Sequence, residues 1–161
     1  MRRAIAVAAV CLGAGAALVA AADFQPLKVK TGLWQMTETP TWTGLPQQWA
    51  AVVKNGKTIN YKSCVRAKDL TTNPWTDGDD SKCVWTVLKS DGTDMEIKAT
   101  SCELGKEWGM TTEGIGKIHV VDSENGTGSV DMTITGNGQI IKGHATYTGK
   151  WIGASCPAHT N

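Results

Sequence analysis

Residues 112–151 constrain the fold more than any other part of the chain. This segment alternates apolar and polar residues and contains two Asn-Gly pairs, Asn125-Gly126 and Asn137-Gly138. Asn and Gly both tolerate the positive φ that tight hairpin turns require. Residues 130–135 alternate without interruption, which is typical of a strand with one buried and one solvated face. The segment therefore predicts three consecutive antiparallel strands.

The second Asn-Gly pair predicts how the last two strands are aligned. If Asn137-Gly138 is a two-residue loop, Met132 lies opposite Gly143 and Ile134 lies opposite Ile141. Directly opposed residues share one face of a sheet, so these side chains form a common apolar face. We expect this register.

The first Asn-Gly pair needs a longer loop. A two-residue loop at Asn125-Gly126 sets the apolar Met132 against His119. Adding Glu124 to the loop sets Met132 against Ile118 instead, and a three-residue loop with Gly last is a common hairpin turn. We expect the three-residue loop.

These two loop lengths together predict a row of three polar side chains. Asp131 would lie opposite His119 on one neighbouring strand and opposite His144 on the other. Two imidazoles and a carboxylate are ligand types that bind Zn²⁺ or Cu²⁺. An exposed ladder, in which Asp131 stabilises charged imidazolium, explains the same row without a metal. We expect the ladder and no metal, with these three residues as the candidate ligands.

The first residues read as an export signal. Arg2 and Arg3 precede the small and apolar residues 4–19, and Ala20-Ala21-Ala22 offers a cleavage site. This pattern predicts a secretory signal peptide over residues 1–22, cleaved near Ala22, and a periplasmic or secreted protein. No later apolar segment approaches the roughly 20 residues that span a bilayer, so no membrane span is expected after cleavage. Residues 23–161 are then expected to form a single domain.

Charge and motifs argue against nucleic-acid binding and against catalysis. The chain has 16 Lys plus Arg against 15 Asp plus Glu, which leaves no basic surplus to follow a phosphate backbone. It contains no nucleophile elbow, zinc-protease helix motif, Walker loop or dinucleotide fingerprint. We therefore expect no enzyme activity, no cofactor and no nucleic-acid partner.

Four cysteines follow the signal peptide: Cys64, Cys83, Cys102 and Cys156. An even number in an exported chain predicts two disulfides, for which three connectivities exist. The predicted hairpin between Cys83 and Cys102 favours that pair and leaves Cys64 with Cys156. The other two connectivities remain alternatives.

The register of the hairpin between Cys83 and Cys102 is ambiguous. A four-residue loop sets the two cysteines opposite each other, whereas a three-residue loop offsets them but pairs Trp85 with Ala99. A β-bulge near Thr100 would reconcile the two registers.

The rest of the chain completes an all-β domain with minor helix. About seven strands, mostly antiparallel and each with one wet face, predict a strongly curved sheet or open barrel whose concave side is the core. Pro40 is expected to end the first strand. The remaining expected elements are strands over residues 31–39, 61–65 and 107–111, a short helix over residues 46–54 and one helical turn over residues 67–70.

Several motifs resemble a known family. Gly32-Leu33-Trp34, Cys64-Val65, the spaced Cys83 and Cys102, and an ending that runs from Trp151-Ile152-Gly153 to Cys156 are similar to the bacterial exported proteins grouped as domain of unknown function 3617. The resemblance implies an exported, disulfide-bonded bacterial domain. It implies no reaction and no ligand.

Tryptophan is unusually frequent. Seven Trp stand against one Phe and two Tyr. On predicted strands lie Trp34, Trp85, Trp108 and Trp151, and in predicted loops lie Trp42, Trp49 and Trp75. The strand set is expected mainly to fill the core. Large apolar side chains in loops cap a core or meet a partner, so the loop set, with Trp34, supplies the candidate contact residues.

Together these features predict an exported binding domain. Its partner would be an apolar small molecule or another envelope protein, and the surplus of Trp and the absence of catalytic motifs motivate this hypothesis. The alternative is a structural envelope protein with a filled core and no ligand.

Overall fold

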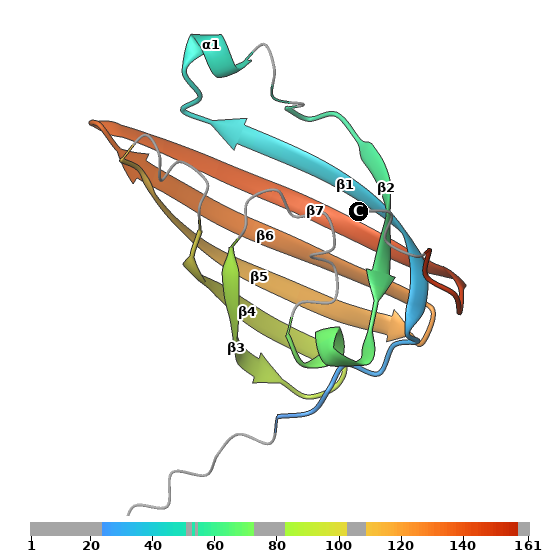
Figure 1. Ribbon diagram of the computed structural model, residues 1–161. Coiled ribbons are helices and arrows are strands. Elements are labelled where there is room, and N and C mark those ends of the chain that lie inside the picture. Colours follow the sequence, from blue (N-terminus) through green and yellow to red (C-terminus); the bar gives the residue numbers. More distant parts are fainter. Residues whose placement is uncertain (1–23, 51–52, 54, 73–82, 103–108, 158–161) are drawn as a thin grey trace, which may run out of the picture.

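One open antiparallel sheet forms the body of the protein in this computed structural model, which describes residues 24–50, 53, 55–72, 83–102 and 109–157 (Figure 1). The strands within these residues are β1 (Gly32–Thr43), β2 (Ile59–Val65), β3 (Val84–Ser90), β4 (Asp94–Ser101), β5 (Thr111–Asp122), β6 (Asn125–Gly136) and β7 (Gln139–Gly153). Their order in the sheet is β2-β1-β7-β6-β5-β4-β3. The expected all-β architecture with seven strands is confirmed.

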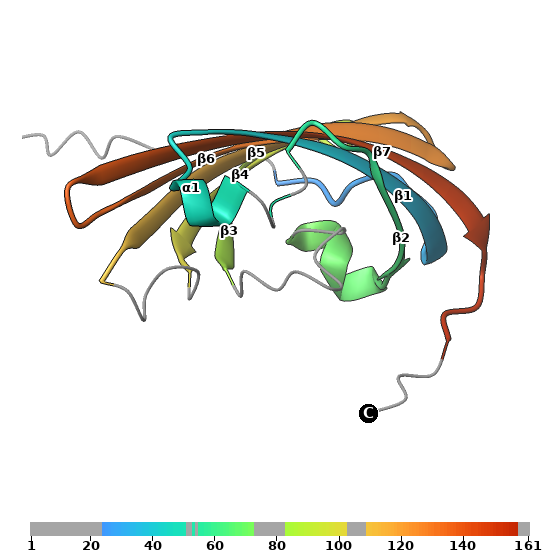
Figure 2. The ribbon, with the colours of Figure 1, turned by 90° about the horizontal axis from the view of Figure 1, so that it is seen from above.

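The sheet arches but does not close. Strands β3 to β7 follow one another as a meander, and the β1–β2 hairpin joins it through β1 against β7. Consecutive strands β2 and β3 therefore lie at opposite edges of the sheet. The sheet is less curved than the strongly curved sheet or open barrel that was expected. The arch in Figure 2 is gentle and leaves the two edges apart.

Two short helices lie on the concave side of the arch, as Figure 2 shows: α1 (Gln47–Ala50) and the 3₁₀ helix η1 (Ala67–Thr71). The buried side chains of this face form two clusters. The first cluster contains Leu27, Val29, Trp34, Met36, Val65, Met95, Ile97, Ile118 and Val120. The second cluster contains Met110, Ile134 and Ile141. The core thus lies on the concave side, as expected.

An extended segment before β1, residues 24–30, crosses one end of the sheet and is called the strap here. Its Leu27 and Val29 belong to the first cluster. Its backbone N–H groups donate to the carbonyl oxygens of Ser90, Leu70, Gly92 and Ser123. The strap thus ties β1 to the β3–β4 turn, to η1 and to the β5–β6 turn.

Glycines let large side chains lie close to the middle of the sheet. A Cβ atom on Gly116 would lie 2.7 Å from the Ile97 side chain, and one on Gly143 would lie 2.5 Å from the Trp42 ring. Both distances are below the closest approach of non-bonded carbon atoms. Large residues from the flanking strands therefore occupy the space that these glycines leave.

The β6–β7 register is as predicted. Met132 lies opposite Gly143 and Ile134 opposite Ile141. Asn137 has φ 50° and Gly138 has φ 74°, the positive values that a two-residue hairpin loop demands.

The predicted β5–β6 register is wrong. Asp122 pairs with Asn125, so the turn is shorter than expected and Met132 lies opposite Gly114 rather than Ile118. The Asp122 carboxylate accepts hydrogen bonds from the Glu124 N–H and the Asn125 side chain, which stabilises this tighter turn.

The β3–β4 hairpin contains both registers that the sequence allowed. Ser90 lies opposite Met95, in the register of the four-residue loop, while Trp85 lies opposite Ala99, in the register of the three-residue loop. The pairing shifts by one residue at Leu88 and again at Thr100. The predicted bulge near Thr100 is therefore confirmed, and Leu88 marks a second one.

Strand β1 continues through Pro40, contrary to the prediction. The Pro40 carbonyl accepts a hydrogen bond from the Gly56 N–H, on the side of the strand where β2 has already ended. In an antiparallel strand the N and O of one residue face the same neighbour, so the missing N–H costs no ladder bond.

Both favoured disulfides are present. Cys83 bonds Cys102 across the bulged hairpin, and Cys64 bonds Cys156, with their Cα atoms 5.6 Å apart. Of the helix expected over residues 46–54, the structure describes α1 and a following hydrogen bond from the Val53 N–H to the Trp49 carbonyl oxygen, and residues 51, 52 and 54 lie outside the described residues. Of the strand expected over residues 107–111, residues 107 and 108 lie outside the described residues, Gly109 and Met110 belong to no strand, and β5 begins at Thr111.

Candidate functional site

The polar face of the sheet carries two separate His–Asp pairs rather than one row. His144 Nδ1 lies 2.7 Å from Asp131 Oδ1, as predicted. His119 lies opposite Thr127 instead of Asp131, and its Nδ1 lies 2.8 Å from Asp94 Oδ1. The three-residue row is therefore wrong. Within the described residues, no group of three or more His, Cys, Asp or Glu side chains could hold a metal ion.

The same polar face has an open depression of about 440 Å³ near the start of β6. Its lining residues are Gln35, Thr37, Val121, Asn125, Gly126, Thr127, Thr148, Gly149 and Lys150. The amide of Gln35 donates to the Tyr61 carbonyl oxygen, and that of Asn125 donates to Asp122. These amides stabilise the sheet, and the depression offers no aromatic surface.

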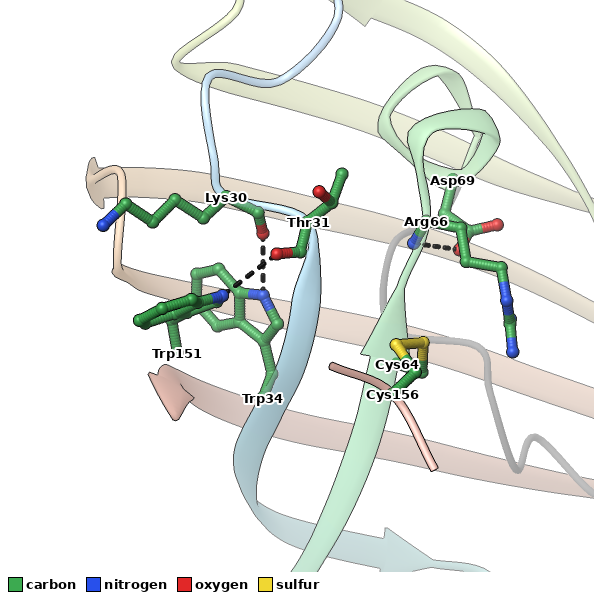
Figure 3. Close-up of a disulfide and its surroundings, with 8 residues drawn as sticks. All are labelled: Lys30, Thr31, Trp34, Cys64, Arg66, Asp69, Trp151 and Cys156. Atoms are coloured by element: carbon green, nitrogen blue, oxygen red, sulfur yellow. Dashed lines mark hydrogen bonds between the residues drawn. A yellow bond between two sulfur atoms is a disulfide. The ribbon is translucent and has the colours of Figure 1, made fainter. Parts of the chain in front are cut away.

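Trp34 and Trp151 stabilise one end of the sheet (Figure 3). They lie opposite each other on β1 and β7, and Trp34 is 0% exposed. The Trp34 indole donates to the Lys30 carbonyl oxygen at 2.9 Å, and the Trp151 indole donates to that of Thr31 at 3.0 Å. Figure 3 also shows the nearby Cys64–Cys156 disulfide. Trp34 is thus a core residue with no exposed surface for a partner.

The other candidate tryptophans differ in position. Trp42 lies near the end of β1 rather than in a loop, and Trp49 lies in α1. Both are half-buried and pack against the second cluster. Trp75, like Trp108 of the strand set, lies outside the described residues.

Between the two core clusters lies the middle of the concave face, defined here by Glu38, Val130, Met132 and Tyr147. All four side chains are half-buried, whereas the neighbouring cluster residues are buried. Tyr147 lies opposite Glu38 on one side and Gly128 on the other. Apolar surface thus remains accessible to solvent at the centre of the face that forms the core.

Glu38 is chemically exceptional on this face. Among the strand positions that the structure describes there, it is the single charged residue, and the others are Gly, Ala, Val, Ile, Met, Pro, Trp, Tyr, Ser, Thr and Gln. The Tyr147 hydroxyl donates a hydrogen bond of 3.4 Å to Glu38 Oε1. This pair places a carboxylate and a phenol at the centre of an apolar surface.

Sequence reasoning missed Glu38 and Tyr147, although a signal was present. Glu38 falls in phase with the buried Trp34 and Met36 of β1, so its side chain had to join the apolar face. Tyr147 is likewise in phase with Ala145 of β7. The signal in the sequence was a charged residue at a strand position that is in phase with the apolar residues.

The fold and the disulfides define the class of the protein: an open antiparallel β-sheet domain, stapled by two disulfides, with short helices on its concave face. The chain belongs to the family described as protein of unknown function (DUF3617), whose model matches residues 29–156. The matched range contains all seven strands and all four disulfide cysteines. No curated protein and no solved structure shows significant similarity to the chain.

Proposed function

We propose that this protein is an exported, non-catalytic domain that binds an apolar small molecule on the middle of its concave face. The observation that carries the proposal is the half-buried state of Val130, Met132 and Tyr147 between two buried clusters. Apolar surface at the centre of a core-forming face is usually covered, and accessible apolar surface of this kind is where ligands or partners bind.

The shape of this region supports a small molecule rather than a flat protein surface. The face is the inner side of the arch, with α1 and η1 on the same side of the sheet (Figure 2). Glycines oppose the large residues, with Gly114 and Gly143 on the two sides of Met132 and Gly116 opposite Val130. Trp42 adds an aromatic side chain over Gly143, which gives one end of the region a large apolar contact.

The proposed location is the periplasm or the exterior of the cell. The signal-like residues 1–22 and the two disulfides support it, because disulfides persist in oxidising compartments. The described residues include no helix of the length and apolar character that crossing a membrane requires.

A lysine substitution tests the proposed surface. Met132→Lys places a charge among apolar groups of the concave face, whereas Thr133→Lys places it on the opposite face, between Glu113 and Lys142. The uncharged dye phenylnaphthylamine is titrated into both variants while its fluorescence is followed. We expect Met132→Lys to weaken dye binding by at least about tenfold and Thr133→Lys to leave it unchanged.

The structural alternative predicts a different titration. A protein with a filled core and no ligand would give no saturable dye signal in the wild type. Equal effects of the two lysine variants would also contradict binding at the concave face. Circular dichroism of both variants establishes that each one is folded.

A further inference from the structure

We infer that the depression on the polar face of the sheet binds a sugar that carries an acidic group. This site goes beyond the proposed function, because it lies on the face opposite the one proposed for the apolar molecule. Its volume of about 440 Å³ falls within the range of ligand pockets in proteins, roughly 300–1,000 Å³. Of its nine lining residues, one is basic and none is acidic.

The base of the depression is a grid of polar side chains in two rows that cross β1, β7 and β6. In each row the residues lie directly opposite one another, so their side chains share one face. The first row is Gln35, Lys150 and Asn125, and the second row is Thr37, Thr148 and Thr127. Strand spacing and residue rise make this grid about 10 Å by 7 Å, which is room for one or two sugar rings.

Two lysines give one end of this grid a positive charge. Lys62 of β2 and Lys150 of β7 lie opposite Gln35 on its two sides, and both are exposed. Neither lysine forms an ion pair with a residue that the structure describes, whereas the nearby acidic residues are already bound. Glu124 is paired with Lys30, Asp94 with His119, and Asp122 accepts from the Glu124 N–H and the Asn125 side chain.

Distance also favours an anion over Gln35. Such an anion would lie one strand spacing, about 5 Å, from the strands of Lys62 and Lys150. It would lie three spacings, about 14 Å, from the strand of Asp122. The second distance exceeds the screening length of about 8–10 Å at ordinary salt, so the attraction of the lysines outweighs the repulsion by Asp122.

The two side-chain amides of the grid present acceptors to the ligand. The Gln35 amide nitrogen donates to the carbonyl oxygens of Met36 and Tyr61. The Asn125 amide nitrogen donates to both carboxylate oxygens of Asp122. Their amide oxygens are therefore left to accept, and an acceptor needs a ligand that brings donors of its own.

The second row adds hydroxyl groups. The hydroxyls of Thr127 and Thr148 are exposed, and each can donate and accept a hydrogen bond. Val121, which is 59% exposed, adds an apolar wall that can contact the C–H groups of a ring. A bare anion would leave the amide oxygens without donors, and a neutral sugar would leave the lysines without an anion. A sugar with an acidic group satisfies both.

A set of probes tests the acidic group separately from the hydroxyls. The acidic sugars glucuronate, galacturonate and glucose 6-phosphate, neutral glucose, and acetate are titrated at constant ionic strength into the oxidised protein, and the backbone amide signals are followed by NMR. Lys150→Gln removes the charge in the depression, and Lys142→Gln is its control on the same strand and face, outside the lining. Thr127→Val removes a lining hydroxyll, and Thr133→Val is its control on β6.

We expect at least one acidic sugar to bind the wild type about fivefold more tightly than glucose or acetate, and to shift the amide signals of Gly126 and Gly149. Lys150→Gln should remove the preference over glucose, and Thr127→Val should weaken binding about threefold or more. Both control variants should stay within about twofold of the wild type.

Three results would overturn the inference: no binding of any acidic sugar, binding no tighter than that of acetate, or equal losses in Lys150→Gln and Lys142→Gln. Circular dichroism of the four variants establishes that each one is folded. None of these results bears on the apolar dye, which is expected to bind the opposite face.

Discussion

Trp34 and Trp151 oppose each other across β1 and β7, and their indole N–H groups donate to the carbonyl oxygens of two consecutive residues, Lys30 and Thr31. The last strand is thereby fixed to the segment that enters the first. Lys30 also lies over the Trp151 ring, with its Nζ 4.6 Å from the ring centre. The tryptophans of the two family-like motifs thus stabilise one end of the sheet.

Replacing Trp34 should destabilise the domain. Trp34→Phe removes the hydrogen bond to the Lys30 carbonyl oxygen and leaves unfilled volume at a position that is 0% exposed. We expect a loss of about 1–3 kcal/mol in the free energy of unfolding, measured with urea. Trp151→Phe, at a half-buried position, should cost less, and the reverse order would contradict this assignment.

The two disulfides should contribute unequally to stability. In the chain-entropy model the Cys64–Cys156 bridge, with a sequence separation of 92, contributes about 4–5 kcal/mol, and the Cys83–Cys102 bridge, with a separation of 19, about 3 kcal/mol. Paired Cys→Ala variants of each bridge, compared by thermal unfolding, should therefore show the larger loss for Cys64–Cys156. Full reduction should loosen or unfold the domain. An unchanged melting temperature after reduction would show that the two disulfides do not stabilise it.

A single methyl group on β7 should disturb the second cluster. In Gly143→Ala the new Cβ would lie 2.5 Å from the Trp42 ring, so the ring must move. We expect a cost of about 1–3 kcal/mol in the free energy of unfolding and a change in Trp fluorescence. Gly153→Ala is the matched control on the same strand, since nothing lies within 4 Å of its Cβ, and it should be nearly neutral.

Two turn aspartates should make stability fall in acid. Hydrogen bonds from the Asp94 and Thr93 N–H groups hold the pKa of Asp91 below its ordinary value of 3.8. The pKa of Asp122 is lowered mainly by the Glu124 N–H. A carboxyl whose pKa is lower in the folded state stabilises fully above its unfolded pKa and loses this contribution as the pH falls through the folded value.

The free energy of unfolding should therefore decrease as the pH drops below 3.8. Urea unfolding between neutral pH and about pH 3 measures this slope. The double variant Asp91→Asn/Asp122→Asn should have a shallower slope than the wild type. Identical slopes would mean that neither carboxylate contributes.

The sequence predicted those registers that local turn chemistry decides. Asn137-Gly138 adopts the two positive φ values, so the β6–β7 alignment followed from the turn alone. The β5–β6 alignment did not, because the predicted and observed registers place the same side chains on the same face. Hydrophobic alternation distinguishes registers that differ by one residue, because such a shift moves every side chain to the other face. It does not distinguish registers that differ by an even number of residues, because each side chain then stays on the same face.

Steric fit decides between such registers. In the observed alignment Val130 lies opposite Gly116 and Met132 opposite Gly114, so each large side chain meets a glycine. The predicted alignment would have placed Met132 against Ile118, and that crowding requires three-dimensional packing to recognise. Glu38 already interrupts the apolar phase of its own strand in the sequence, whereas the lack of other charges at the described strand positions of its face becomes visible only in the folded sheet.

The disulfides and the tight turns explain how this domain stays folded, and the concave face is where its function is proposed to lie. The most direct test is to purify the exported wild-type protein and its Met132→Lys variant under native conditions. Denaturing extraction and mass spectrometry then identify any small molecule that each one carries. The account predicts a near-stoichiometric apolar small molecule with the wild type that is depleted from the variant. The same molecule in equal amount with both proteins, or none with the wild type when apolar dye also fails to bind, would contradict it.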